Sequence, residues 1–193
     1  MAQLHNEFVF HNQTQGSDEL GSRVALVTGG NRGIGREICM QLAQRGVGRV
    51  ILSGRDLGAA KLAAFELNSK IASPGSVSAG GEAGIIVPAQ LNVADCSSVE
   101  SLATWISAEC GGRLDILVNN AGCCFDADMT GNLSFCQSNV ETISQVELMS
   151  SFELNVCAQV QVTQYMLPFL KRSPAARIVN MSSVLGSLTM QVR

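Results

Sequence analysis

The residues best suited to chemistry in this sequence are three glycines with a regular spacing. Gly29, Gly33 and Gly35 follow Thr28, and this stretch comes directly after the apolar run 24–27. A glycine turn that opens a helix leaves backbone N–H groups unpaired, and such groups bind anions. Glycine is needed because a side chain would obstruct both the tight turn and the approach of a diphosphate. The spacing therefore predicts a dinucleotide site, which also includes Asn31, Arg32 and Ile34.

Five apolar runs predict the strands that must hold this turn. The first run is continuously apolar, which is typical of a strand buried on both faces in a parallel sheet. Pro88 marks the expected end of the third strand. The expected strands are 24–27, 50–52, 85–87, 114–118 and 178–181.

Helical periodicity separates these strands. Ile34, Ile38 and Leu42 recur every four residues and predict one apolar helix face. Helix caps favour short polar side chains. The expected caps are Asp56 for the second helix and Ser97 or Ser98 for the third. A long helix is expected from about 145 to 171, with Pro168 near its end and an apolar stripe of Met149, Phe152, Val156, Val160, Leu167 and Leu170.

The alternation of strands and helices predicts a parallel sheet with helices on both faces. Right-handed crossovers make this an α/β doubly wound fold of the Rossmann type, which binds dinucleotides. Loops are expected at 73–84 and 123–144. Residues 1–22 contain no Lys or Arg, which argues against a secretory or transit signal. We expect 1–22 to be a flexible extension and 23–193 to be one dinucleotide-binding domain.

Composition excludes several classes of function. The net charge is −3 and the basic residues form no cluster, which argues against nucleic-acid binding. No apolar run is long enough to span a membrane. The seven cysteines show no CxxC spacing, which favours reduced thiols in a cytoplasmic protein. Because both histidines, His5 and His11, lie in the expected extension 1–22, no metal site is expected.

Four further elements follow the glycine turn in a fixed order. They are Asn92-Val93, Asn119-Asn120-Ala121-Gly122, Asn155 in the long helix, and Asn180-Met181-Ser182-Ser183. With the glycine pattern T-G-x-x-x-G-x-G, this order resembles the short-chain dehydrogenase/reductase family, and most closely its carbonyl reductase-like members. The resemblance implies a fold of seven strands, of which five are present here. It also implies hydride transfer between a nicotinamide coenzyme and a small-molecule carbonyl or alcohol substrate.

Two arginines bear on the choice of coenzyme. In the family, an arginine in the glycine turn and another past the second strand pair with a 2′-phosphate, and Arg32 and Arg55 stand there. Their planar forks suit phosphate, and Ser53 and Gly54 replace the acid that would bind a free 2′-hydroxyl. We therefore expect NADP(H) in preference to NAD(H). The alternatives are that Asp56 binds the ribose, although helix capping explains it better, and that the arginines are solvated surface charge.

The resemblance also assigns roles to the asparagine elements. Asn92 stands where the family has an aspartate that touches the adenine amino group, and an amide can both accept and donate there. Asn119 would line the adenosine side and brace the sheet, and it could equally be a buried structural amide. The expected cofactor set is completed by three neighbours in these elements, Val93, Ala121 and Gly122.

Two residues are implied to serve catalysis. By resemblance, Asn155 holds a water in a proton relay, and Ser183 hydrogen-bonds the substrate carbonyl. Their alternatives are helix-packing polarity for Asn155 and loop polarity for Ser183. The family's proton donor is a tyrosine with a lysine four residues later, but the only tyrosine, Tyr165, is followed at that spacing by Phe169. We expect Tyr165 to be a packing residue.

This missing pair leads to two hypotheses. In the first, the chain is the N-terminal part of an oxidoreductase and stops before the Tyr-x-x-x-Lys element. In the second, it is an inactive dinucleotide-binding remnant or a partner-binding variant. Either way, the fifth strand and the long helix are expected to present apolar surface. The long helix resembles one used in family dimers, so the resemblance leaves a homo-oligomer open.

Overall fold

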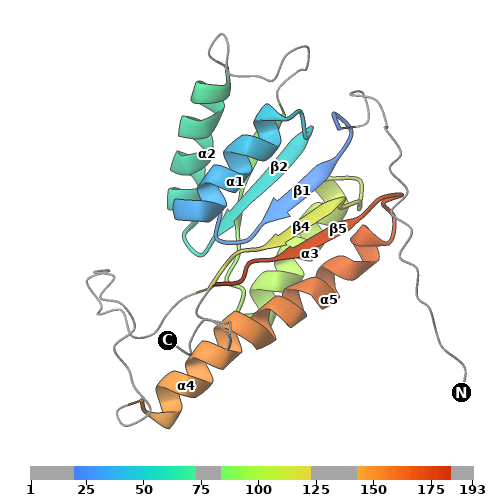
Figure 1. Ribbon diagram of the computed structural model, residues 1–193. Coiled ribbons are helices and arrows are strands. Elements are labelled where there is room, and N and C mark those ends of the chain that lie inside the picture. Colours follow the sequence, from blue (N-terminus) through green and yellow to red (C-terminus); the bar gives the residue numbers. More distant parts are fainter. Residues whose placement is uncertain (1–19, 73–83, 123–142, 184–193) are drawn as a thin grey trace, which may run out of the picture.

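A computed structural model describes residues 20–72, 84–122 and 143–183 as a parallel sheet between two layers of helices (Figure 1). Residues 1–19 of the expected extension and most of the two expected loops lie outside the described residues. The elements are β1 (Val24–Val27), α1 (Gly33–Gln44), β2 (Arg49–Gly54), α2 (Leu57–Ile71), β3 (Ile85–Gln90), α3 (Cys96–Glu109), β4 (Ile116–Asn119), α4 (Gln145–Phe152), a π-helical turn (Glu153–Cys157), α5 (Ala158–Leu170) and β5 (Arg177–Asn180).

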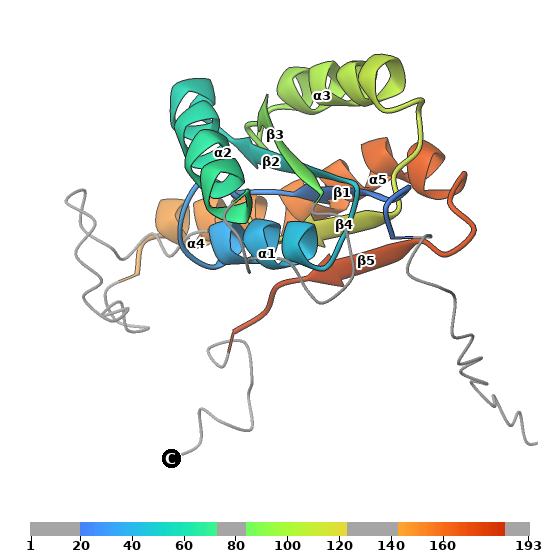
Figure 2. The same ribbon diagram turned by 90° about the horizontal axis from the view of Figure 1, so that it is seen from above.

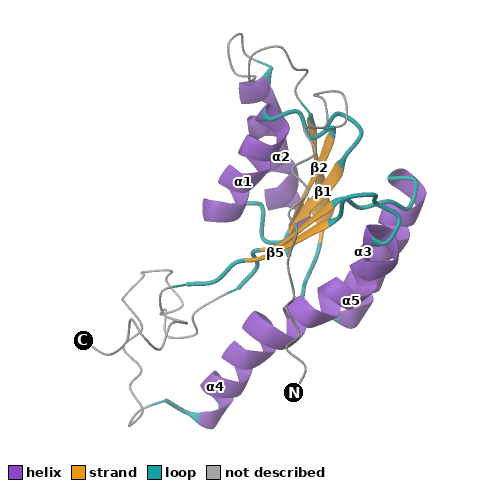
Figure 3. Ribbon diagram, turned by 45° about the vertical axis from the view of Figure 1, so that its right-hand side comes forward, coloured by secondary structure: helices purple, strands orange, loops and turns teal. Residues whose placement is uncertain are grey.

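The sheet has the order β3-β2-β1-β4-β5, and all of its neighbouring strands are parallel. Seen from above in Figure 2, β3 and β5 lie at its opposite edges. Figure 3 shows α1 and α2 on one face and α3 and α5 on the other. The chain turns to opposite sides of β1 to make β2 and β4, which confirms the doubly wound α/β fold.

The sheet is buried on both faces because successive strand residues point in opposite directions. In β1, Ala25 and Val27 pack under α1 and α2, whereas Leu26 packs under α3 and α5. All three side chains are fully buried. This arrangement explains why β1 is apolar without interruption, as the sequence predicted.

The expected apolar face of α1 is confirmed only in part, because Ile38 and Leu42 are partly buried against the core whereas Ile34 is not. Ile34 is 66% exposed, and the fully buried residues are Gly35, Cys39 and Ala43. These residues are small, so α1 can lie close to the sheet. Ile38 is only partly buried, at the side of this contact. Periodicity found the helix and the approximate side of it that packs, but not the small residues that make the closest contact with the sheet.

Several boundaries also differ from expectation. β2 spans Arg49–Gly54 instead of 50–52, and β5 spans Arg177–Asn180 instead of 178–181. Pro88 lies inside β3, opposite Leu52, and is tolerated because β3 is an edge strand that needs no second ladder. The cap of α3 is Asp95, which accepts from Ser97 N at 3.0 Å, and not Ser97 or Ser98. β4 begins at Ile116 instead of 114. The cap of α2 by Asp56 is confirmed, with Ala59 N at 3.0 Å.

The long helix is interrupted by the π-helical turn, and its buried side was not the one expected. The buried residues of α5 are Ala158, Val162, Met166 and Leu170, so only Leu170 of the expected stripe is buried. Its other members are exposed, as are Ile178 and Val179 of β5. The expectation of exposed apolar surface on this helix and on β5 is therefore confirmed.

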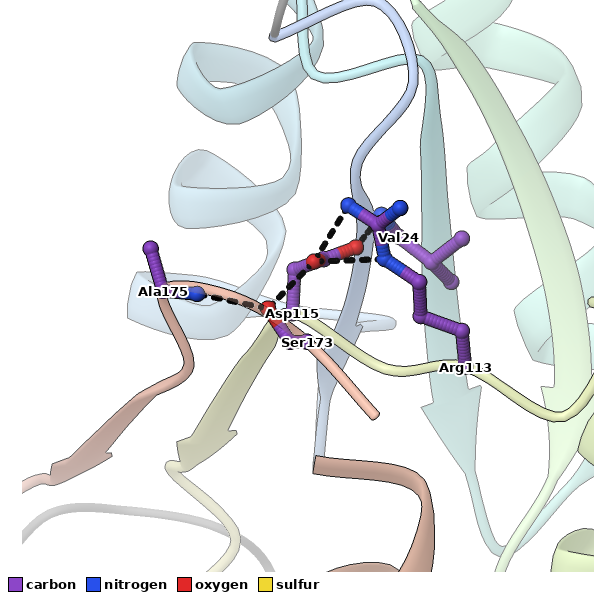
Figure 4. Close-up of polar contacts among 5 residues, drawn as sticks. All are labelled: Val24, Arg113, Asp115, Ser173 and Ala175. Carbon is purple, nitrogen blue, oxygen red and sulfur yellow. Dashed lines mark hydrogen bonds and ion pairs between the residues drawn. The ribbon is translucent and has the colours of Figure 1, made fainter. Parts of the chain in front are cut away.

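One buried carboxylate joins three segments where β1 and β4 begin (Figure 4). Asp115 is 1% exposed and accepts hydrogen bonds from Val24 N at 2.9 Å, Arg113 Nε at 2.8 Å and Ser173 Oγ at 2.6 Å. Ser173 Oγ in turn accepts from Ala175 N at 3.2 Å, before β5. Burial raises the pKa of Asp115, but the bonds from Ser173, Arg113 and Val24 outweigh burial and hold this pKa below its ordinary value.

We expect Asp115→Asn to lower the free energy of unfolding at pH 7 by about 2 kcal/mol, because hydrogen bonds to a charged acceptor are lost. A depressed pKa stabilises the fold above the unfolded-state pKa, about 3.9, and this contribution disappears as pH falls through the lower folded-state value. The difference between variant and wild type should therefore shrink in acid. Denaturant unfolding at a series of pH values measures it.

The matched control is Asp56→Asn, since Asn caps a helix about as well as Asp. We expect it to change the free energy of unfolding by less than about 0.5 kcal/mol. Equal effects of the two variants would contradict a special role for Asp115.

Candidate functional site

A cleft of about 1030 Å³ lies over the carboxyl ends of the strands. Open α/β sheets bind ligands at this edge. It brings together every predicted cofactor-binding residue except Asn119. The lining residues are Gly29, Asn31, Arg32, Gly33, Ile34, Gly35, Gly54, Arg55, Asp56, Leu91, Asn92, Val93, Ala94, Asn120, Ala121, Gly122, Ser150, Glu153 and Leu154.

The glycine turn is fastened to the end of β4 by Thr28 and Asn120. Thr28 Oγ1 accepts from Asn120 N and Ala121 N, both at 2.9 Å. Asn120 Nδ2 donates to the carbonyls of Thr28 at 2.9 Å and Gly29 at 3.2 Å. A Cβ on Gly35 would lie 2.4 Å from Asn120 Nδ2, so no other residue fits there. Sequence reasoning did not single out Thr28 and Asn120 as site residues, although both belong to the quoted motifs.

The turn then opens α1 toward the cleft. Gly29 and Gly33 have φ of +64° and +54°, which favour glycine. A Cβ on Gly33 would meet nothing within 4 Å, so this position faces open space. The first turn of α1 contains no acidic residue and no side-chain cap. Its free N–H groups and positive dipole end therefore fit an anionic diphosphate.

The sulfur beneath the turn is inert. Cys39 Sγ would lie 3.0 Å from a Cβ on Gly30. Burial raises the pKa of the Cys39 thiol to about 12, so the thiol stays protonated at neutral pH. Its role is to fill the space between α1 and the turn.

The end of β2 is basic. Ser53 is buried and its Oγ donates to the Val27 carbonyl at 3.0 Å, so it does not face a ligand. Arg32 and Arg55 are exposed where they line the cleft, and neither guanidinium has an ion-pair partner in the described part of the chain. The carboxylate of Asp56 is held by the helix that it caps. The arginines thus form a positive rim at the end of β2. The exposed Glu153, which also lines the cleft, belongs to the π-helical turn.

Asn119 does not line the cleft. It is 1% exposed, and its Nδ2 donates to Thr163 Oγ1 at 3.0 Å and to Asn180 Oδ1 at 2.8 Å. These bonds connect β4 with α5 and with the end of β5. The structure therefore shows Asn119 as a buried amide that braces the sheet, and the expected contact with the adenosine side stays a prediction.

Of the two expected catalytic residues, only Asn155 is shown close to a residue that lines the cleft. Asn155 belongs to the π-helical turn, and its Oδ1 would lie 2.8 Å from a Cβ on Gly122. π-helical turns are frequent at functional sites. Ser183 is exposed, three residues after the end of β5 at Asn180. Neither is among the residues that line the cleft.

Tyr165 is confirmed as a packing residue. It is partly buried on α5 and packs, with Phe169, against the core beneath α3 and α5. Among the residues described, no group of three or more metal-binding side chains comes together. In the same residues, no helix has both the length and the apolar character needed to cross a bilayer.

Comparisons with known proteins agree with this geometry. A family model described as short chain dehydrogenase matches residues 23–193. The chain is 34% identical to (−)-isopiperitenone reductase from Mentha piperita and 33% identical to carbonyl reductase [NADPH] 1 from Sus scrofa. The alignments cover 87% and 86% of this chain, and 59% and 48% of those proteins.

A solved structure shows the same likeness. Menthone neomenthol reductase from Mentha piperita matches with a TM-score of 0.69 and 32% identity, over 87% of this chain and 62% of that one. The chain therefore spans about half to three fifths of the length of these relatives. The family match over residues 23–193, on a doubly wound sheet with its glycine turn at the cleft, shows that the chain belongs to the short-chain dehydrogenase/reductase family of oxidoreductases.

Proposed function

We propose that this chain is the coenzyme-binding part of an NADP(H)-dependent oxidoreductase that acts on a small-molecule carbonyl or alcohol. The observation that carries the proposal is the cleft in which a glycine turn, a helix N-terminus without a side-chain cap and two arginines meet, neither arginine having an ion-pair partner among the described residues. When bound, the nicotinamide donates or accepts the hydride. The described residues bind and orient the coenzyme.

Charge supports NADP(H) over NAD(H). Arg32 and Arg55 line the cleft, where β2 ends in Ser53 and Gly54 and not in an acid. Arginine binds a phosphate through two parallel charge-assisted bonds. The Sus scrofa relative is named as an NADPH enzyme, which points the same way.

Two residues are proposed to serve the substrate. Ser183 follows β5 at the ligand-binding edge of the sheet, where its hydroxyl would donate to the substrate carbonyl. Asn155 would hold a water in a proton relay from the π-helical turn, beside Gly122. Proton transfer to the developing alkoxide needs a further acid, and Tyr165 is packed in the core.

This position of Tyr165 favours a second candidate, a dinucleotide-binding protein without hydride transfer. Calorimetric titration with NADPH and a carbonyl-dependent NADPH oxidation assay separate the two. We expect residues 1–193 to bind NADPH without turnover, and a longer chain with a Tyr-x-x-x-Lys element to oxidise it. Turnover by 1–193 alone would contradict the second candidate, and failure to bind would contradict both.

The location is proposed to be cytoplasmic. Cys39, Cys96, Cys110 and Cys157 are free thiols, which suits a reducing compartment. Absence of the protein from a cytosolic fraction would contradict this assignment.

We expect Gly33→Ala to weaken NADPH binding by about tenfold or more, which corresponds to about 1.4 kcal/mol. The added methyl would occupy the open space where α1 begins. The matched control is Gly111→Ala, because Gly111 has a similar φ of +61° and also faces open space, but lies after α3 and outside the cleft. Each variant should lose about 1 kcal/mol of stability from backbone strain. Calorimetry should show weaker binding in Gly33→Ala alone, and equal affinities would contradict the diphosphate site.

We expect the preference for NADPH over NADH to fall by a factor of about ten or more in the double variant Arg32→Ala/Arg55→Ala, because charge-assisted bonds to the phosphate are removed. The ratio of the two dissociation constants measures this change. The control is Arg45→Ala, which removes an exposed charge at the other end of α1 and should leave the ratio unchanged. An unchanged ratio in the double variant would show that these arginines do not bind a 2′-phosphate.

A further inference from the structure

The cleft continues into a second chamber beyond Arg55. This chamber has a volume of about 420 Å³ and lies between the end of β3 and the start of α3. Arg55 and Asn92 line both spaces, so they stand at the junction. The other chamber residues are polar: Gln90, Asp95, Ser97, Ser98 and Ser101.

The succession of lining residues along the cleft indicates where the base of a bound coenzyme would lie. If the diphosphate lies at the glycine turn and a 2′-phosphate at Arg55, the base falls on the far side of the ribose, at residues 91–94. Leu91 and Val93 are buried there and supply apolar contact. Asn92, between them, is the amide available to the base edge. This placement rests on the proposed function.

The hydrogen bonds of Asn92 decide which of its atoms face the base. Its backbone N donates to Ser98 Oγ at 2.9 Å, and its carbonyl accepts from Asp95 N at 3.1 Å. Its Oδ1 accepts from Ala94 N at 3.4 Å. If the amide were flipped, Nδ2 would face Ala94 N, and two hydrogen-bond donors would meet. Oδ1 is therefore the atom that faces Ala94 N, and Nδ2 is available as a donor to a ligand.

We propose that Asn92 makes the base subsite tolerant of a 6-oxo purine. Its Nδ2 can donate to the O6 of hypoxanthine, and the second lone pair of Oδ1 can accept from the 6-amino group of adenine. An aspartate at this position could only accept, and its charge would repel O6. Residue 92 is therefore a specificity-determining residue for the purine of the coenzyme.

The test compares the binding of NADPH with that of its hypoxanthine analogue, nicotinamide hypoxanthine dinucleotide phosphate in reduced form. Calorimetry gives the ratio of the two dissociation constants for wild type and Asn92→Asp. We expect the wild-type ratio to lie within about threefold of one, less than a single hydrogen bond provides. In Asn92→Asp the analogue should bind at least about tenfold more weakly than NADPH. The variant keeps its acceptor for Ala94 N, so its fold should be unaffected.

The matched control is Gln90→Glu, which makes the same change of amide to acid in the same chamber. Gln90 Nε2 donates to the Arg55 carbonyl at 3.2 Å. This variant should weaken the binding of both coenzymes equally and leave the ratio of their dissociation constants near one. A wild-type ratio of about tenfold, or equal ratios in Asn92→Asp and wild type, would overturn the proposal. Failure of wild type to bind either coenzyme would instead overturn the proposed function, and this inference with it.

Discussion

The hydrogen bonds between Thr28 and Asn120 are the constraint on which the site depends. They join the ends of β1 and β4, which are neighbours in the sheet, and fix the glycine turn before any ligand arrives. Because Asn120 Nδ2 and the Gly29 carbonyl oxygen each lie 2.4 Å from the position of a Cβ on Gly35, this residue has no room for a side chain. A rigid turn avoids the entropy that an adaptable loop would lose on binding. At the other end of β1, Asp115 gives the same strand a second fixed point.

Sequence patterns were sufficient wherever the determining interactions are local. The glycine turn, the apolar character of β1 and the cap of α2 by Asp56 each depend on a few adjacent residues, and the structure has them as predicted. The cleft likewise contains the expected arginines, because the order of strands in a doubly wound sheet follows from its alternation. That β2 ends in Ser53 and Gly54, with no acid, could also be read directly from the chain.

The features that sequence reasoning missed depend on tertiary contacts. Ile34 has helical spacing, but only the packed structure shows that the smaller Gly35 and Cys39 face the sheet. Pro88 ends a strand by local rules, yet an edge position removes the reason for ending it. Thr28 and Asn120 are ninety-two positions apart in the chain, so no local pattern could pair them. The orientation of the Asn92 amide is set by Ala94 N–H and is equally invisible in the sequence.

The π-helical turn between α4 and α5 has a consequence for how this cleft can vary. Such a turn contains one residue more than the corresponding turn of an α-helix. Adding or removing one residue rotates the preceding helix residues by about 100° about the helix axis. After the turn, α5 packs on the core, whereas Ser150 of α4 and Leu154 of the turn itself line the cleft. An insertion or deletion in this turn would therefore change the direction of the side chains that line the cleft, and the sheet would stay as it is. Insertions and deletions at this turn can thus change the shape of the binding cleft more readily than substitutions can, while the sheet stays unchanged.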